Sequence, residues 1–145
     1  LWLADIAELI ELLDDRYAVM CVHHDHRPKE STKMIDAVQT QYPRKNWSSM
    51  VLYNCSHPAN QKLTPDVVNR ETGAFLHRFQ WLEDELIGAL PESWNWLEGW
   101  SEKPGAGQPK VVHYTRGGPW FENWRDVAYA DLWQSELAAY KSARR

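Results

Sequence analysis

The sequence predicts an α/β fold, a mixed sheet with helices packed on it, from three observations. Short continuous apolar runs, typical of strands buried on both faces, occur at 17–22 and 50–53. Segments with a helical spacing of apolar residues alternate with these runs, most clearly at 128–143. The 145 residues, 43% of them apolar and 25% charged, have the size and composition of one globular domain.

The first half of the chain is expected to hold a short helix, two strands and a long loop. Asp5 is a suitable N-cap for a helix over 6–13. The residues expected on its apolar face are Ile6, Leu9, Ile10 and Leu13. Between the strands at 17–22 and 50–53, the polar residues 23–44 show no sustained period, which predicts a loop with one helical turn near 31–37.

The second half is expected to hold helices and a third strand. Thr64 and Pro65 are good residues for the start of a helix that stops near Gly73, and 74–82 continues helically. A turn-rich loop leads to a strand at 110–114. The expected apolar side of the last helix, 128–143, consists of Leu132, Trp133, Leu137 and Tyr140.

Charge and composition exclude some classes of protein. A net charge of -4 argues against non-specific nucleic-acid binding, which depends on a basic surface. The sequence has no secretory signal and no apolar run of the ~18 residues that span a membrane, so a cytoplasmic protein without a transmembrane segment is predicted. Cys21 and Cys55 both lie in apolar runs and are expected to be buried thiols rather than a disulfide.

The strand at 110–114 carries His113 and is followed by a glycine pair, Gly117 and Gly118. Glycines let the backbone approach a ligand closely, and exposed N–H groups bind anions. Arg116 adds positive charge suited to a diphosphate. On spacing alone, a simpler interpretation is favoured, in which a strand ends in a glycine turn and His113 is hydrogen-bonded in place.

The segment from His113 to Trp120 resembles the closing His…Lys-Pro-Trp element of family-8 glycosyltransferases, which include glycogenin and bacterial lipopolysaccharide glycosyltransferases. In that family the histidine completes a manganese site begun by an Asp-x-Asp motif, so the resemblance implies that His113 binds Mn²⁺ (or Mg²⁺). Pro119 and Trp120 match the closing pair. Gly118 stands where the family usually has a lysine that contacts the diphosphate, and Arg116 is the nearest substitute.

Two further segments appear in the order of that family. Asn46, Ser48 and Ser49 precede the strand at 50–53 and resemble the turn that binds the donor sugar, with the asparagine displaced by one position. About thirty residues on, Glu83 and Asp84 match the family's catalytic-site acid, and Asp84 is preferred. A turn that begins a strand, and a solvated acidic surface, remain the structural alternatives.

The opening residues resemble the segment that follows Asp-x-Asp in the same family. The chain has no initiator Met and begins in an apolar stretch, Leu1 to Leu3, so residues 1–145 are expected to be a single partial catalytic domain. The nucleotide-binding half and the Asp-x-Asp motif would then precede Leu1. The resemblance implies the C-terminal part of a GT-A-like nucleotide-diphospho-sugar transferase fold, a mixed sheet with flanking helices.

Other candidates are weaker. The loop residues 23–26 include three histidines and an aspartate, but adjacent side chains of an extended chain cannot all reach one ion, so a polar loop is favoured. In the resemblance this loop borders the donor pocket. A basic loop suits an anionic substrate, although simple solubility explains it as well; its residues are Lys29, Lys33, Arg44 and Lys45. Trp94, Trp96 and Trp100 are candidates for an acceptor platform or for the core.

The resemblance implies a retaining hexosyltransferase of polysaccharide biosynthesis. The intact enzyme would move a hexose from a UDP-sugar to a hydroxyl of a glycan or lipid-linked saccharide, with a divalent metal, and residues 1–145 alone would be inactive. The alternative, drawn from nine tryptophans, is a non-catalytic carbohydrate-binding or interaction module with a Trp-rich surface.

Overall fold

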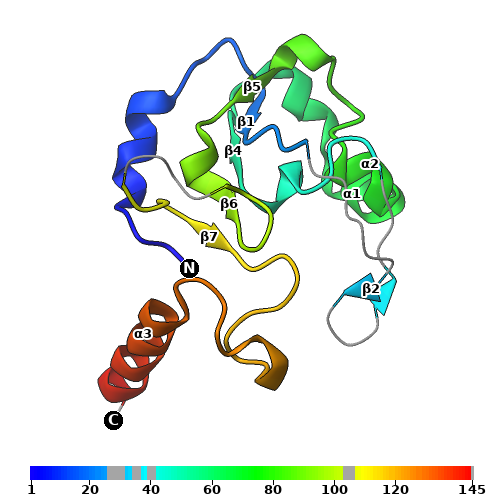
Figure 1. The fold of residues 1–145 in the computed structure, drawn as a ribbon. Coiled ribbons are helices and arrows are strands. Elements are labelled where there is room, and N and C mark those ends of the chain that lie inside the picture. The colour runs from blue at the N-terminus through cyan, green and yellow to red at the C-terminus, as the bar shows by residue number, and fades with distance from the viewer. Residues whose placement is uncertain (26–31, 34–36, 39–41, 103–106, 145) are drawn as a thin grey trace.

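A small mixed sheet forms the centre of the protein (Figure 1). The computed structural model describes residues 1–25, 32–33, 37–38, 42–102 and 107–144. The sheet has the strand order β4-β1-β5. β1 (Val19–Cys21) runs antiparallel to β4 (Val51–Tyr53) and parallel to β5 (Ile87–Ala89). The predicted strands at 17–22 and 50–53 and the predicted α/β class are confirmed.

Two further strand pairs lie outside the central sheet. β6 (Trp96–Leu97) and β7 (Val112–His113) are parallel, with Leu97 opposite His113. β7 is the predicted strand at 110–114, whereas neither β5 nor β6 is predicted from the sequence. β2 (Thr32–Lys33) and β3 (Ala37–Val38) are antiparallel. The helical turn predicted near 31–37 is therefore wrong at these described residues; the rest of that segment lies outside them.

Short helices connect the strands, and side-chain caps explain where several of them begin. The α-helices are α1 (Pro65–Arg70), α2 (Gly73–His77) and α3 (Ala130–Ala143). The 3₁₀ helices are η1 (Ile6–Leu12), η2 (Trp47–Ser49), η3 (Pro58–Lys62), η4 (Asp84–Leu86), η5 (Glu92–Asn95) and η6 (Glu122–Trp124). Asp5, Thr64 and Thr72 accept backbone hydrogen bonds at the starts of η1, α1 and α2.

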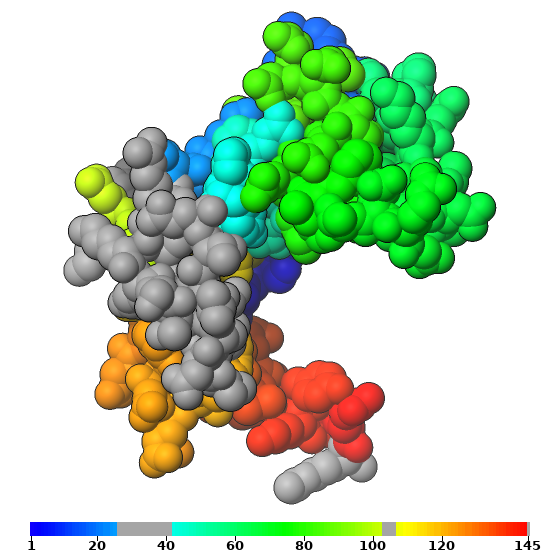
Figure 2. Space-filling model, turned by 90° about the vertical axis from the view of Figure 1, so that its right-hand side faces the viewer, coloured from blue at the N-terminus to red at the C-terminus, as the bar shows by residue number. Residues whose placement is uncertain are grey.

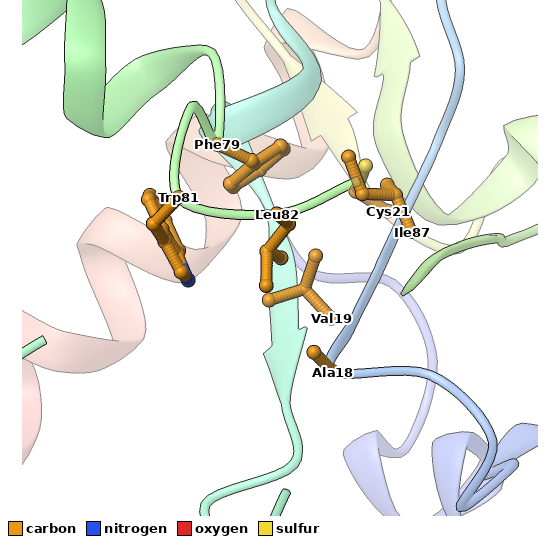
Figure 3. Packing of buried hydrophobic residues seen from close by; sticks show 7 residues of the cluster. All are labelled: Ala18, Val19, Cys21, Phe79, Trp81, Leu82 and Ile87. Atoms are coloured by element: carbon orange, nitrogen blue, oxygen red, sulfur yellow. The ribbon is translucent and has the colours of Figure 1, made fainter. Parts of the chain in front are cut away.

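The two faces of β1 carry two separate parts of the core. Val19 and Cys21 belong to a cluster with Phe79 and Leu82, which follow α2 (Figure 3). Met20 and Val22 belong to a second cluster, which includes Leu9 of η1 and Trp94 of η5. Figure 1 shows α1 and α2 on one side of the sheet and η1 on the other. Because β1 is covered on both faces, its apolar run is continuous.

Several local predictions are wrong for identifiable reasons. Tyr53, the last residue of the edge strand β4, is exposed, so the run at 50–53 is not buried throughout. On η1 only Leu9 is buried, whereas Ile6, Ile10 and Leu13 are exposed. A 3₁₀ helix has three residues per turn, so the α-helical face expected here does not form.

The helical segments in the second half of the chain also differ from the prediction. The helix predicted over 74–82 ends at His77, because Phe79 adopts a left-handed backbone conformation (φ 52°) that no α-helix continues. The last helix, predicted over 128–143, forms as α3. None of its residues is buried, although Trp133 packs against a third cluster built on Trp96, Val112 and Tyr114. Figure 2 shows α3, in red, projecting from the body of the molecule.

The two cysteines lie in different surroundings. Both are free thiols, with Cys21 in the core and Cys55 exposed, so the prediction that both are buried is wrong for Cys55. Cys55 follows edge strand β4 in a turn, where no second layer covers it. In the described residues, no helix has both the length and the apolarity needed to cross a membrane.

The difference in burial predicts a difference in thiol reactivity. Burial raises the pKa of Cys21 to about 12, and the thiolate is the reactive form. At pH 8 we expect a disulfide reagent to modify Cys55 rapidly and Cys21 only after unfolding. Two thiols titrating at one rate in the native protein, or a fast phase that survives Cys55→Ser, would contradict this assignment.

Candidate functional site

A pocket of about 560 Å³ lies at the carboxyl ends of the parallel strands β1 and β5. Its residues come from the loop after β1, the end of β5, η5 and the turn after β6. The lining residues are Val22, His23, His24, Asp25, Ala89, Leu90, Glu92, Leu97, Trp100 and Ser101. Open α/β sheets bind ligands at this edge, and pockets of about 300–1,000 Å³ accommodate small molecules. The combination of one indole with several polar groups suits a polar ligand that has apolar faces.

His23 is held in this pocket by the turn before β4. Its imidazole stacks on Trp47, with ring centroids 4.0 Å apart and planes 2° apart. The Trp47 indole N–H donates to the His24 carbonyl at 2.9 Å. Burial lowers the pKa of His23, while a hydrogen bond with the backbone of Gly88 opposes that shift. The neutral form of the ring is therefore favoured, and because its one N–H donates to the backbone of Gly88, the other nitrogen can accept one hydrogen bond from a ligand.

The predicted sugar-binding turn lies at the same edge of the sheet, because antiparallel β4 begins where β1 ends. Asn46 has a left-handed backbone (φ 64°), and its carbonyl accepts from Ser49 Oγ at 2.6 Å. The Asn46 side-chain Nδ2 is buried and forms no hydrogen bond within the described part of the chain. Ser48 Oγ is 2.8 Å from His77 Nδ1. The serines are thus occupied by contacts within the protein, whereas the Asn46 Nδ2 is a buried, unsatisfied donor within the described residues.

The two predicted acids are at the opposite end of β5. Glu83 and Asp84 precede its first residue, whereas the pocket lies after its last. Asp84 pairs with Arg44, whose guanidinium also donates to the Phe79 carbonyl at 3.3 Å. Arg44 is therefore a structural cation rather than a freely solvated one. The Asp84 side chain is 83% exposed, and its charge acts on His23 through space.

His113 lies on β7, where the N-terminal segment of the chain joins it. The Leu1 nitrogen donates to the Val112 carbonyl at 2.9 Å, and the Val112 amide donates to the Leu1 carbonyl at 2.8 Å. Trp2 bridges to Val111 in an antiparallel arrangement. Figure 1 shows the N-terminus beside β7. Residues more than a hundred positions apart in sequence thus pair at Val111 and Val112, next to His113.

The described residues do not form a metal centre by themselves. No group of three or more His, Cys, Asp or Glu side chains that could hold an ion occurs among them. His26, one member of the predicted histidine cluster, lies outside the described residues. A metal bound by His113 would therefore need ligands from other parts of the protein.

The loop after His113 is packed by aromatic side chains. Arg116 pairs with the buried Glu98 at 3.3 Å and lies over the Trp124 ring, 4.9 Å from its centroid. A Cβ on Gly117 would come within 2.6 Å of Trp124, and one on Gly118 within 2.0 Å of Trp120. These glycines therefore admit indoles; whether they also admit a diphosphate stays a prediction.

Trp120 and the predicted group of Trp94, Trp96 and Trp100 have different surroundings. Trp120 is half exposed and contacts the rings of Tyr114 and Trp133, at centroid distances of 5.9 and 5.5 Å. Trp94 and Trp96 are buried in the core, so they do not form an acceptor platform. Of that predicted group, Trp100 lines the pocket.

Sequence reasoning missed three polar residues of this region. Ser101 Oγ donates to Glu92 at 2.5 Å on the pocket wall. Asn95 is buried and reaches the turn before β4. The available signal was the alternation of polar residues with tryptophans in 92–101. Several tryptophans in a short segment are typical of a packed region rather than of a surface loop.

The structure shows a mixed α/β protein with a pocket at the carboxyl ends of two parallel strands. The chain is 63% identical over 148 residues to Protein CDI of Arabidopsis thaliana. The match covers 100% of this chain but 57% of that relative, so the chain spans little more than half of the relative's length. No protein-family model matches the chain, and no solved structure matches it.

Proposed function

We propose that this chain forms the C-terminal half of a GT-A-like retaining hexosyltransferase. The enzyme would move a hexose from a UDP-sugar to a hydroxyl of a glycan or lipid-linked saccharide in the cytoplasm, with Mn²⁺ or Mg²⁺. The observation that carries this proposal is the pairing of Leu1 with Val112, next to His113.

The direction of that pairing defines the neighbour of His113. Leu1 and Val112 exchange two hydrogen bonds, and Trp2 is opposite Val111, so each step back along the first segment is one step forward along β7. A residue preceding Leu1 would be directly opposite His113 in a non-hydrogen-bonded pair, with Cα atoms about 4.5 Å apart. Directly opposite side chains share one face of a ladder. A carboxylate from an Asp-x-Asp motif ending there would lie against the imidazole.

The sugar would occupy the pocket at the carboxyl ends of β1 and β5. His23 lines it, and the buried Asn46 amide donor belongs to the turn that packs on His23 through Trp47. Amide and imidazole groups donate to and accept from sugar hydroxyls. Their contribution would be orientation of the donor and acceptor rather than proton transfer.

Arg116 and Asp84 would contribute through their charges. Arg116 is the first basic residue after His113 in the sequence, and Glu98 and Trp124 hold its guanidinium in place. It would contact the diphosphate. Asp84 would act on the pocket through Arg44 and His23. A divalent metal, when bound, neutralises the departing diphosphate. Because His113 is one ligand alone, the proposal requires further ligands preceding Leu1.

A second candidate function is a non-catalytic carbohydrate-binding module. The specific observation in its favour is that Trp100 lines the pocket beside Glu92 and Ser101. An indole face with adjacent hydrogen-bonding groups is sufficient to bind a sugar without any nucleotide.

Nucleotide dependence separates the two functions. The full-length protein is incubated with UDP-glucose or UDP-galactose and Mn²⁺, and UDP and free hexose are measured, with EDTA as the control. We expect hexose release that EDTA abolishes, and none from residues 1–145 alone. Binding of free oligosaccharides without any binding of UDP would overturn the transferase proposal and favour the module.

A further inference from the structure

Asn95 connects the pocket to the turn that precedes β4. It is the last residue of η5 and is 1% exposed. Its side-chain Nδ2 donates to Ser49 Oγ at 2.8 Å and lies 3.4 Å from the Asn46 carbonyl oxygen. Glu92, at the start of the same helix, lines the pocket. One short helix thus supplies both a pocket wall and a support for the turn.

The chemistry of the contact defines which end of the Asn95 amide faces the turn. A backbone carbonyl only accepts, so Nδ2 and not Oδ1 must point to Asn46. Ser49 Oγ accepts from Asn95 and donates to the same Asn46 carbonyl at 2.6 Å. Three groups therefore close a small network around a residue with a left-handed backbone (φ 64°). A buried network of this kind fixes one conformation of the turn.

We propose that Asn95 is a positioning residue that holds Asn46 in the orientation needed to bind the hexose of the donor. The inference rests on the proposed function, and in it Asn95 acts on the sugar only through Asn46. Asparagine adopts a left-handed backbone more readily than most residues, and the network around Asn46 stabilises this conformation further. The buried Nδ2 of Asn46 has no hydrogen-bond partner in the described residues, and a hydroxyl of the bound hexose would satisfy it.

The test separates the sugar from the nucleotide. Affinities of the full-length protein for UDP and for a non-transferable UDP-hexose analogue are measured by calorimetry. Asn95→Asp keeps the size of the side chain but turns a donor into a carboxylate facing two acceptors. We expect about a 10-fold loss of affinity for the UDP-hexose analogue, the equivalent of one well-made hydrogen bond, and unchanged affinity for UDP.

Asn60 provides the matched control. It is another internal asparagine, whose Nδ2 donates to the carbonyls of Ala18 and Asn54 at 2.7 and 2.9 Å, far along the chain from η5. Asn60→Asp should destabilise the fold while leaving the ratio of the two affinities unchanged. Equal effects of Asn95→Asp and Asn60→Asp on that ratio would show a purely structural role and overturn the inference.

A second variant covers the case in which Asn95→Asp does not fold. Ser49→Ala removes the exposed end of the network and should lower the affinity for the UDP-hexose analogue alone, whereas Ser135→Ala on α3 should not. Wild-type protein that binds UDP, with no selective effect of Ser49→Ala, refutes the role of Asn95 only. Wild-type protein that binds neither UDP nor the analogue refutes the proposed function, and the inference with it.

Discussion

Replacement of His113 by alanine in the full-length protein should lower metal-dependent hydrolysis of UDP-hexose by at least ~100-fold, which is the scale on which loss of one group that stabilises developing charge acts. The physical reason is that the imidazole would be the ligand contributed from β7, opposite residues that precede Leu1. The measurement is UDP release at saturating Mn²⁺, together with the Mn²⁺ concentration required for half-maximal rate.

His57 offers a control histidine. Its Nδ1 accepts from the Ala59 amide at 3.2 Å at the start of η3, so His57→Ala should cost some stability and leave the metal requirement unchanged. If His113→Ala hydrolyses UDP-hexose at the wild-type rate with the same Mn²⁺ dependence, His113 is not a metal ligand. Its role on β7 would then be structural.

The elements predicted from sequence are those that local chemistry determines. The buried run around Met20, the Thr64–Pro65 helix start and the periodic segment of α3 each carry their signal within a few residues. β5 and β6 are not recognised from the sequence, and it is the hydrogen bonds of distant partners that define them as strands. β5 pairs with β1 from more than sixty residues away, and β6 pairs with β7 across a loop.

The candidate site likewise contains residues that the sequence indicates and residues that only the fold brings together. Asn46 and His113 are identifiable from residue type and order, since Asn46 precedes the apolar run at 50–53 and His113 follows Val111 and Val112. Asn95 contacts Asn46, and Glu98 contacts Arg116. Both are ordinary polar residues in a tryptophan-rich segment, and only the fold brings them to these partners. The glycine pair is recognised from the sequence, but as a loop that could approach a ligand. In the structure the missing side chains leave room for two indoles that pack on the pair.

The second large effect is expected in the core, at Phe79. The side chain is fully buried among Val19, Leu82 and Trp81, and its ring meets Trp81 edge-on at 5.6 Å (Figure 3). Phe79→Ala should lower the free energy of unfolding by about 3–5 kcal/mol, since it removes a large buried ring and leaves a cavity. Urea denaturation followed by tryptophan fluorescence measures this loss.

Phe79 also has a backbone that is unusual for its size. After α2 ends, its φ of 52° is the left-handed conformation that glycine commonly supplies at a helix end, and a side chain there costs about 1–2 kcal/mol. Phe79→Gly should therefore be more stable than Phe79→Ala by about 1 kcal/mol. At an ordinary backbone position glycine is less stable than alanine by about 0.5–1 kcal/mol.

Leu82 makes the comparison decisive because it lies in the same cluster with an ordinary backbone. Leu82→Gly should be less stable than Leu82→Ala, the reverse of the order at Phe79. The same order at both positions would mean that the left-handed turn does not exist in solution. The Phe79 carbonyl would then no longer be positioned to accept from Arg44, which also pairs with Asp84.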